Sequence, residues 1–326
     1  MTGFWDGKKV LVTGGAGFIG GHLVELLVHR GARVRVPQEP GKDLSLPREL
    51  RPSVELLSGD LLDPGFCRKA ARGQEVVMDL AAVVGGIHYN IARPASIFRD
   101  NLRLFMNVLE AARLEGAERF LVTSSASVYP RRCSQPTPED EGFAGVPEPT
   151  TEGYGWAKRM AEFLGAAYRK EYGMRVGIAR PQNAYGPRCN FDPKRSHVIP
   201  ALIRRVVEGE APLRVWGDGS QSLTFLYVTD LVRGLLAVAE RHAEADPINL
   251  GSAESIRIRD LVKLICEAAG AEPEIVFDTS APTGQPRRQC DTRKAEEVLG
   301  FRPEVPLREG LRRTVEWYRQ NKRTWA

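Results

Sequence analysis

Short apolar runs alternate with helix-like patterns over the first 180 residues. Residues 10–12 read Val-Leu-Val and lead into glycines, and the apolar residues at 23, 24, 26 and 27 follow with helical spacing. A strand that is buried on both faces reads as a continuous apolar run, and strands that alternate with helices are typical of a parallel sheet. We therefore predict an α/β fold built on a doubly wound parallel sheet.

Three glycines separate the first predicted strand from the helix that follows it. Gly14, Gly17 and Gly20 allow a sharp turn and let backbone N–H groups approach a pyrophosphate at the helix N-terminus. In this strand–helix context the glycines predict a dinucleotide site, which includes Phe18 and Ile19, on a Rossmann sheet. The alternative is a tight turn that holds no ligand.

The pattern after residue 180 is looser and predicts a second domain. We assign residues 1–180, together with about 223–250, to a dinucleotide-binding domain, because the strand and helix pattern around 225–251 indicates a return to the main sheet. Residues 181–222 and 251–326 then form a smaller C-terminal α/β lobe for the substrate. Residues 130–150 are rich in Pro, Gly, Glu and Thr and predict a long loop, either one that closes over a site or an inert surface loop.

The end of the second strand bears on the choice between NAD and NADP. An acid there binds the ribose 2′-OH of NAD, whereas an arginine suits the 2′-phosphate of NADP. This chain has Pro37-Gln38-Glu39 at that place, and Arg33 and Arg35 come just before it. The period-2 alternation of a strand also allows both arginines to face solvent instead of the cofactor. We favour NAD as the cofactor and keep NADP as the alternative. Asp60, after the third strand, either meets the adenine or forms a turn.

A tyrosine and a lysine four residues apart provide candidate acid–base chemistry. Tyr154 and Lys158 share one face of a predicted helix. The lysine ammonium stabilises a neighbouring phenolate, which can take a proton from a sugar hydroxyl while hydride leaves the same carbon. Open sheets bind ligands at the carboxyl ends of their strands, and the turn after the strand at 119–123 offers Ser124, Ser125 and Ser127. The alternative is a chance surface pair beside an ordinary turn.

Together these motifs resemble the extended short-chain dehydrogenase/reductases, the nucleotide-sugar epimerase/dehydratase family, over nearly all 326 residues. The resemblance implies that Ser125, Tyr154 and Lys158 form a catalytic triad. It also implies further cofactor contacts, which come from Asp60, Leu61, Ala81, Ala82 and Asn101.

Within that family, residues 81–87, 190–205 and 276–288 are most similar to the GDP-L-fucose synthases and the GDP-mannose 3,5-epimerases. The resemblance implies a nucleotide diphosphate sugar as substrate, with GDP as a candidate nucleotide. It implies His197 as a second acid/base, although a histidine bonded to backbone at a helix start is the alternative. It implies substrate contacts from Gly86, Asn183, Asn190, Val198, Arg205, Trp216 and Arg288.

Three positions depart from these relatives. Ser127 stands where they use a cysteine, and a serine hydroxyl is a poorer proton donor than a thiol, whose pKa is about 8.5, so double epimerisation is not expected. Ala126 and Ser127 stand where sugar dehydratases carry an acid, which disfavours elimination of water. Leu223 stands where the family has a phosphate-binding arginine, so another base must neutralise the diphosphate or the ligand differs.

Composition and charge limit the classes of molecule that we expect this chain to bind. The net charge of +5 suits a diphosphate, but the chain has no lysine/arginine block that would indicate nucleic acid. No apolar run approaches the roughly 18 residues of a membrane span. The five cysteines lack CxxC spacing and the N-terminus leads directly into a strand, so we expect reduced thiols, no metal site and a cytoplasmic location.

The helices predicted over 97–115 and 153–172 are apolar on more than one face, which predicts either a homodimer through this pair or ordinary core packing. The leading functional hypothesis is an NAD-dependent nucleotide-sugar epimerase that acts through a transient ketosugar, with Tyr154 as base. The second hypothesis is an NADPH-dependent 4-ketosugar reductase. The third is a non-catalytic, cofactor-sensing protein.

Overall fold

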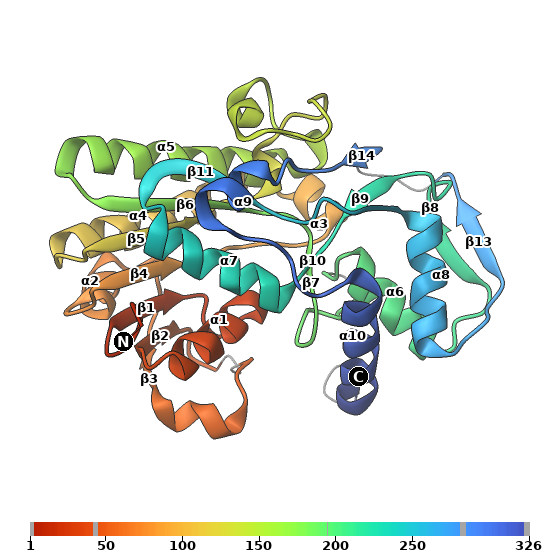
Figure 1. Ribbon diagram of the computed structural model, residues 1–326, viewed down its shortest axis with the longest axis horizontal. Helices are drawn as coiled ribbons and strands as arrows, with labels where there is room; N and C mark the ends of the chain where they lie inside the picture. The colour runs from red at the N-terminus through yellow and green to blue at the C-terminus, as the bar shows by residue number, and fades with distance from the viewer. Residues whose placement is uncertain (1–2, 42–44, 194, 281–284, 323–326) are drawn as a thin grey trace.

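A seven-stranded sheet forms the larger part of the computed structural model, which describes residues 3–41, 45–193, 195–280 and 285–322 (Figure 1). The order across the sheet is β11-β6-β5-β4-β1-β2-β3, and neighbouring strands are parallel. This confirms the predicted doubly wound α/β fold. The strands are β1 (Lys9–Thr13), β2 (Arg33–Gln38), β3 (Val54–Ser58), β4 (Val76–Asp79), β5 (Arg119–Thr123), β6 (Arg175–Pro181) and β11 (Glu244–Leu250).

Helices cover both faces of this sheet because its strands are apolar on both sides. Val10 and Val12 of β1 pack into one core with α1 and α7, whereas Leu11 packs into a second core with α2, α4 and α5. Burial of a side chain of this size stabilises the fold by about 2 kcal/mol. These helices are α1 (Phe18–His29), α2 (Pro64–Ala71), α4 (Pro94–Leu114), α5 (Glu152–Tyr172) and α7 (Val228–Arg241).

A smaller lobe, on the right in Figure 1, has its own core. Three helices in this lobe, α6, α8 and α10, pack around the short parallel pair β8–β13, and the buried residues lie between Tyr185 and Tyr318. The boundaries of the two predicted domains stay a prediction. The elements are α6 (Val198–Val207), α8 (Ile258–Ala269), α10 (Leu307–Asn321), β8 (Leu213–Trp216) and β13 (Ile275–Asp278).

Two further small sheets connect the lobe to the main sheet. One pairs β7 (Ala184–Tyr185) with β10 (Leu226–Tyr227). The prediction that the strand near Phe225 returns to the main sheet was therefore wrong, because α7 begins directly after Tyr227 and leaves only a two-residue strand; β11 is the strand that returns. The other small sheet contains β12 (Ser255–Arg257), β9 (Ser222–Thr224) and β14 (Arg287–Arg288).

The predicted long loop at 130–150 is fixed to its surroundings. Single β-bridges join Pro130 to Pro147 and Thr137 to Cys290. Two 3-10 turns, η3 (Glu139–Phe143) and η4 (Pro149–Thr151), lie within this loop and at its end. The other short helical segments of the chain are α3 (Ile87–Ala92), α9 (Arg293–Leu299), η1 (Arg48–Ser53) and η2 (Ala126–Val128). Among the helices of the described residues, none has the length and apolar character needed to cross a membrane.

Candidate active site

The glycine turn between β1 and α1 forms a cradle of exposed backbone. Gly14 has a φ of +65°, and a Cβ there would lie 2.8 Å from the backbone of Leu80. A Cβ on Gly20 would lie 2.1 Å from the Gly14 carbonyl oxygen. Gly17 begins α1 without a side-chain cap, so the first amides of the helix face outward, where an anion binds well. These residues fit the diphosphate of a dinucleotide.

A buried hydroxyl–carboxyl pair shapes the floor beside this cradle. Thr13 Oγ1 donates to Asp79 Oδ1 at 2.5 Å and accepts from the backbone amides of Leu80 and Ala81 at 3.1 Å each. Burial raises the pKa of Asp79 to about 6, against the opposing effects of the Lys158 charge and the Thr13 hydrogen bond. The pair therefore fixes the turn that holds the predicted cofactor contacts Ala81 and Ala82.

Asn101 of α4 holds the next part of the same loop. Its side chain accepts from the Val83 amide at 2.9 Å and donates to the carbonyls of Val83 and Ile97 at 3.0 and 2.8 Å. Asn101 is buried. The structure thus gives Asn101 a role in shaping the loop, and a direct cofactor contact stays a prediction.

After β3, Asp60 is exposed and its carboxylate accepts from the Leu62 amide at 2.8 Å, which is the geometry of a turn. The carbonyl of Leu61 accepts from the Asn107 side chain at 3.0 Å. Arg35 donates to carbonyl oxygens in and just beyond α2 at 2.8 and 2.9 Å and pairs with Glu55 at 2.9 Å. Its guanidinium is therefore engaged, and the choice between NAD and NADP stays open.

The candidate acid–base pair lies at the start of α5. Tyr154 is in the first turn and partly exposed, while Lys158 is buried with its Nζ 5.6 Å from the centre of the Tyr154 ring. Lys158 Nζ also donates to the Thr123 carbonyl at 2.7 Å, at the carboxyl end of β5. The structure therefore brings the pair to the edge of the sheet where parallel folds bind their ligands.

The hydroxyl-rich turn after β5 packs directly against this part of α5. A Cβ on Gly155 would lie 2.4 Å from the Ser127 carbonyl oxygen, so the two segments are in contact. The Ser125 hydroxyl, partly exposed, accepts from the Ser127 amide at 3.1 Å, whereas Ser127 is buried. Arg159 of α5 donates twice to the Val128 carbonyl, at 2.9 and 2.6 Å. The turn that carries Ser125 thus packs against the start of α5, which carries Tyr154, and their joint catalytic role stays a prediction.

His197 lies directly before α6 and does not cap that helix with its side chain. The residue is exposed. A Cβ on Gly86 would lie 3.6 Å from the Ser196 carbonyl oxygen, so this segment meets the loop that follows β4. Val198 is the first residue of α6, and Lys194, in the same predicted segment, lies outside the described residues.

The remaining predicted substrate contacts have different surroundings. Asn183 donates to the Thr224 carbonyl at 2.8 Å and links the two small sheets, and Asn190 is exposed. Arg205 pairs with Glu210 and also donates to the Arg214 carbonyl at 2.5 Å, so its guanidinium is engaged within the lobe. Its role as a phosphate ligand stays a prediction.

Trp216 and Arg288 present groups that suit a nucleotide. Trp216 is 47% exposed and meets His88 of α3 edge to face, with ring centres 5.2 Å apart. Arg288 Nε donates to Gln285 at 2.7 Å. In β14 and β9, Arg288 is paired in register with Leu223, so both side chains leave the same face of the sheet. Arg288 therefore lies beside Leu223, the position at which the resemblance predicts an arginine.

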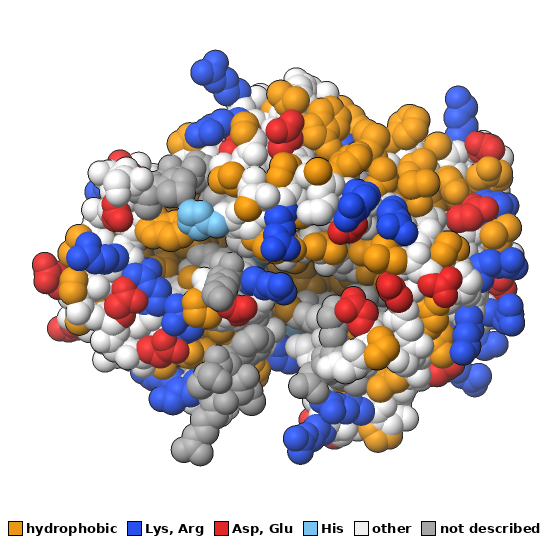
Figure 2. Space-filling model, turned by 180° about the vertical axis from the view of Figure 1, so that it is seen from behind, with side chains coloured by type: hydrophobic (Ala, Val, Ile, Leu, Met, Phe, Trp, Pro, Cys, Tyr) orange, Lys and Arg blue, Asp and Glu red, His pale blue; other side chains and the backbone are white. Residues whose placement is uncertain are grey.

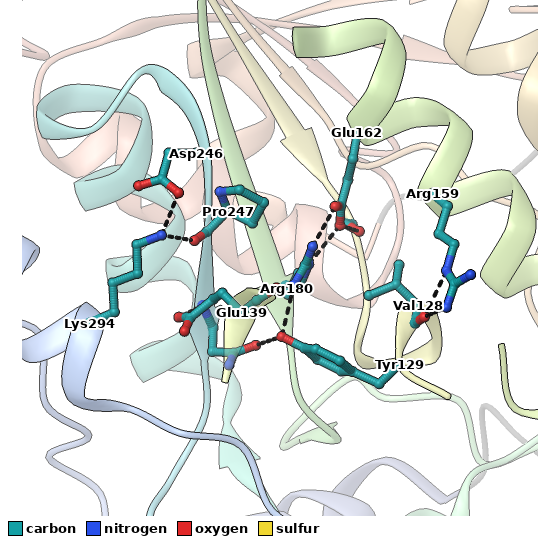
Figure 3. Close-up of polar contacts among 11 residues, drawn as sticks. Val128, Tyr129, Glu139, Arg159, Glu162, Arg180, Asp246, Pro247 and Lys294 are labelled. Carbon is teal, nitrogen blue, oxygen red and sulfur yellow. Dashed lines mark hydrogen bonds and ion pairs between the residues drawn. The ribbon is translucent and has the colours of Figure 1, made fainter. Parts of the chain in front are cut away.

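Sequence reasoning missed a group of buried polar residues behind the hydroxyl turn. Glu162 and Arg180 form an ion pair in which the side chains are 3% and 1% exposed (Figure 3). A charged residue in an otherwise apolar run is the signal that could have found them. Arg180 is the next-to-last residue of β6, after the apolar stretch of that strand, and Glu162 follows Lys158 on the same helix face.

A comparison with known families settles the broad class. The model described as the NAD dependent epimerase/dehydratase family matches residues 10–251. The chain belongs to this family. It is therefore a nicotinamide-dependent enzyme that acts on sugar nucleotides. Among the described residues, no group of three or more His, Cys, Asp or Glu side chains is arranged to hold a metal ion.

Individual relatives of this enzyme match over almost their whole length. The chain is 37% identical to probable GDP-L-fucose synthase 1 of Oryza sativa subsp. japonica, with 97% of this chain and 93% of the relative aligned. It is 35% identical to a dTDP-4-dehydro-6-deoxy-D-allose reductase of Streptomyces bikiniensis, with 98% of each aligned. The crystal structure of UDP-glucose 4-epimerase from Thermotoga maritima with UDP-glucose matches at a TM-score of 0.86, with 30% identity over 96% of this chain and 99% of that chain.

Proposed function

We propose that this enzyme reduces a ketone on a nucleotide-linked sugar, with Tyr154 as the proton donor. The observation that carries the proposal is the position of Tyr154 and Lys158 against the turn that holds Ser125, at the carboxyl end of β5 and next to the glycine cradle. A group that exchanges a proton at an oxygen, beside a site that fits a nicotinamide dinucleotide, is what carbonyl reduction requires.

Each residue has a distinct part in this chemistry. When bound, the nicotinamide supplies the hydride. The Tyr154 phenol gives a proton to the ketone oxygen, and the Ser125 hydroxyl donates a hydrogen bond to that oxygen and orients it. Lys158, fixed by its bond to the Thr123 carbonyl, holds a positive charge beside the Tyr154 ring and stabilises the phenolate that remains. The reverse reaction oxidises the corresponding alcohol.

The name of one relative favours reduction over epimerisation. The relative from Streptomyces bikiniensis is named a reductase of a 4-dehydro sugar, and 98% of its length aligns with this chain. We therefore rank the second of the hypotheses drawn from the sequence above the first. Ser127 argues against inversion at the carbons beside the ketone in either reaction, because a buried serine hydroxyl does not move protons there as readily as a thiolate.

Epimerisation without net reduction is the second candidate. It is favoured by the similarity of the fold to UDP-glucose 4-epimerase at a TM-score of 0.86. In that reaction the same residues act twice: Tyr154 first removes a proton from the sugar hydroxyl and then returns one after the ketone has turned in the site.

The nucleotide diphosphate is proposed to lie along the lobe. We assign the exposed face of Trp216 to the base and Arg288 to the diphosphate, since Arg288 is the cation in register with Leu223. We also assign the imidazole of His197 to a hydrogen bond with the sugar. These assignments rest on the resemblance, on the exposure of Trp216 and His197, and on the register of Arg288 with Leu223.

A panel of substrates tests the proposal. Purified enzyme is incubated with 4-ketosugars and 4-hydroxysugars linked to GDP, UDP, dTDP and CDP, with NADH or NADPH, in D₂O. A reductase oxidises the added cofactor in proportion to product and leaves the carbons beside carbon 4 free of deuterium. Interconversion of sugars without net oxidation supports the epimerase instead. Failure to convert any member of the panel contradicts both.

A further inference from the structure

A network of buried side chains lies directly behind the hydroxyl turn. Its centre is the pair formed by Arg180 of β6 and Glu162 of α5, joined by two hydrogen bonds of 2.7 and 2.8 Å (Figure 3). A buried charge is costly unless its partner and its remaining hydrogen bonds are in place. The third side of the guanidinium is also used, because Nη1 donates to the Tyr129 hydroxyl and to the Glu139 carbonyl.

One end of the network reaches the residue beside the candidate catalytic serine. The Ser124 hydroxyl donates to Glu162, and the Ser124 amide donates to the Ala179 carbonyl at 2.7 Å, one residue before Arg180. Ser125 follows directly. The place of the Ser125 hydroxyl therefore depends on the ion pair as well as on strand pairing.

The other end reaches the lobe. The Tyr129 hydroxyl donates to Asn249 Oδ1 at 2.6 Å, and the Asn249 amide group donates to the carbonyls of Thr137 and Asp291 at 3.1 and 3.2 Å. Backbone bonds of 2.8 and 2.9 Å join Thr137 to residues 289 and 291. These residues follow Arg288 immediately, so the chain of contacts runs from the hydroxyl turn to the strand with the proposed diphosphate ligand.

We propose that Ser124, Tyr129, Glu162, Arg180 and Asn249 form one positioning network that aligns the sugar end of the site with the diphosphate end. The proposal rests on the proposed function, because it assumes that Ser125 and Arg288 hold two parts of one substrate. Tyr129 acts as a positioning residue and not as an acid, since burial keeps the pKa of its hydroxyl above the usual 10.

The substitution Tyr129→Phe tests the network with little change of volume. It leaves Asn249 without its donor and Arg180 without one acceptor. We expect kcat to fall by about 100-fold, the scale expected when a reacting group is displaced by about 1 Å, and KM for the nucleotide sugar to rise. The dinucleotide Kd stays unchanged. The matched control is Tyr318→Phe, at a similarly buried tyrosine in the core of the lobe, whose hydroxyl donates to Glu208 at 2.7 Å.

A purely structural role gives a different result. Both variants then lose thermal stability, while kcat measured well below Tm stays at the level of the unsubstituted enzyme in each. That outcome overturns the proposal.

Amide hydrogen exchange decides the question independently of activity. In Tyr129→Phe and in Ser124→Ala, we expect residues 124–129 and 287–291 to exchange faster together, although the two segments are remote in sequence. Faster exchange confined to the substituted segment overturns the proposal. If the unsubstituted protein converts no sugar nucleotide, the proposed function fails, whereas the exchange result still decides whether the two segments are coupled.

Discussion

At the scale of single residues, Asp79 couples the site to pH. Its carboxyl group is 3% exposed, and burial raises its pKa from 3.8 to about 6. Between these values the folded protein keeps a proton that the unfolded chain has released. The free energy of unfolding therefore falls as pH rises through this window, by about 3 kcal/mol in total from this group.

The substitution Asp79→Asn removes this pH dependence. The asparagine oxygen can still accept a hydrogen bond from the Thr13 hydroxyl, but the side chain no longer ionises. We expect the variant to unfold at a higher temperature than the unsubstituted protein near pH 8 and to lose that advantage near pH 4. Thermal denaturation across this range provides the measurement. If the Tm of both proteins changed with pH to the same extent, Asp79 would not be the group that makes stability depend on pH.

At the scale of elements, different glycines of the turn between β1 and α1 serve folding and cofactor binding. Gly20 is required by the fold, because a Cβ there meets the Gly14 carbonyl oxygen at 2.1 Å. Gly17 is exposed, and its Cβ would approach that oxygen only to 3.3 Å. A methyl group on Gly17 therefore intrudes mainly into the space that the cofactor diphosphate is expected to fill.

Gly17→Ala is expected to fold with a Tm close to that of the unsubstituted protein and to bind NAD(H) or NADP(H) at least about tenfold more weakly, a loss of about 1.4 kcal/mol. Calorimetric titration measures the affinity. His29→Ala, at the exposed far end of the same helix, is the control and leaves affinity unchanged. Equal affinity in Gly17→Ala would show that this turn does not hold the cofactor diphosphate.

The elements that the sequence predicted well are those fixed by local pattern. Apolar runs, the glycines and the four-residue spacing of Tyr154 and Lys158 identified β1, α1 and α5. The strand near Phe225 was assigned to the wrong sheet, because a two-residue strand carries no period. The Arg180–Glu162 pair was missed, because the two residues are 18 positions apart in the sequence. The hydrogen bonds that join Tyr129 and Glu139 of the same network to Asn249 span more than 100 positions. Such contacts depend on the packing of distant segments.

At the scale of the whole molecule, α4 and α5 present an apolar surface to the outside. Met106, Leu114, Phe163 and Tyr172 are between 46% and 61% exposed, and all four lie on these two helices. Figure 2 shows hydrophobic side chains gathered at the upper right, on the side where these helices lie. A patch of this kind on a pair of packed helices is typical of an interface between proteins.

We predict that a second copy of the chain covers this surface. Phe163→Glu together with Met106→Glu places charges in the centre of the patch and should convert a dimer to a monomer, because an unpaired charge is costly to bury. Sedimentation velocity measures the change. Val298→Glu, at an equally exposed valine on α9, serves as the control. A protein that is monomeric without any substitution contradicts the prediction.

The most direct measurement is turnover by Tyr154→Phe, which keeps the ring and removes the phenolic oxygen. We predict that kcat with the best nucleotide sugar falls by about 100- to 10,000-fold while the dinucleotide Kd is unchanged. Tyr172→Phe, at the other end of α5, should retain full turnover. Undiminished kcat in Tyr154→Phe would contradict the assignment of this phenol as the group that exchanges a proton with the sugar oxygen.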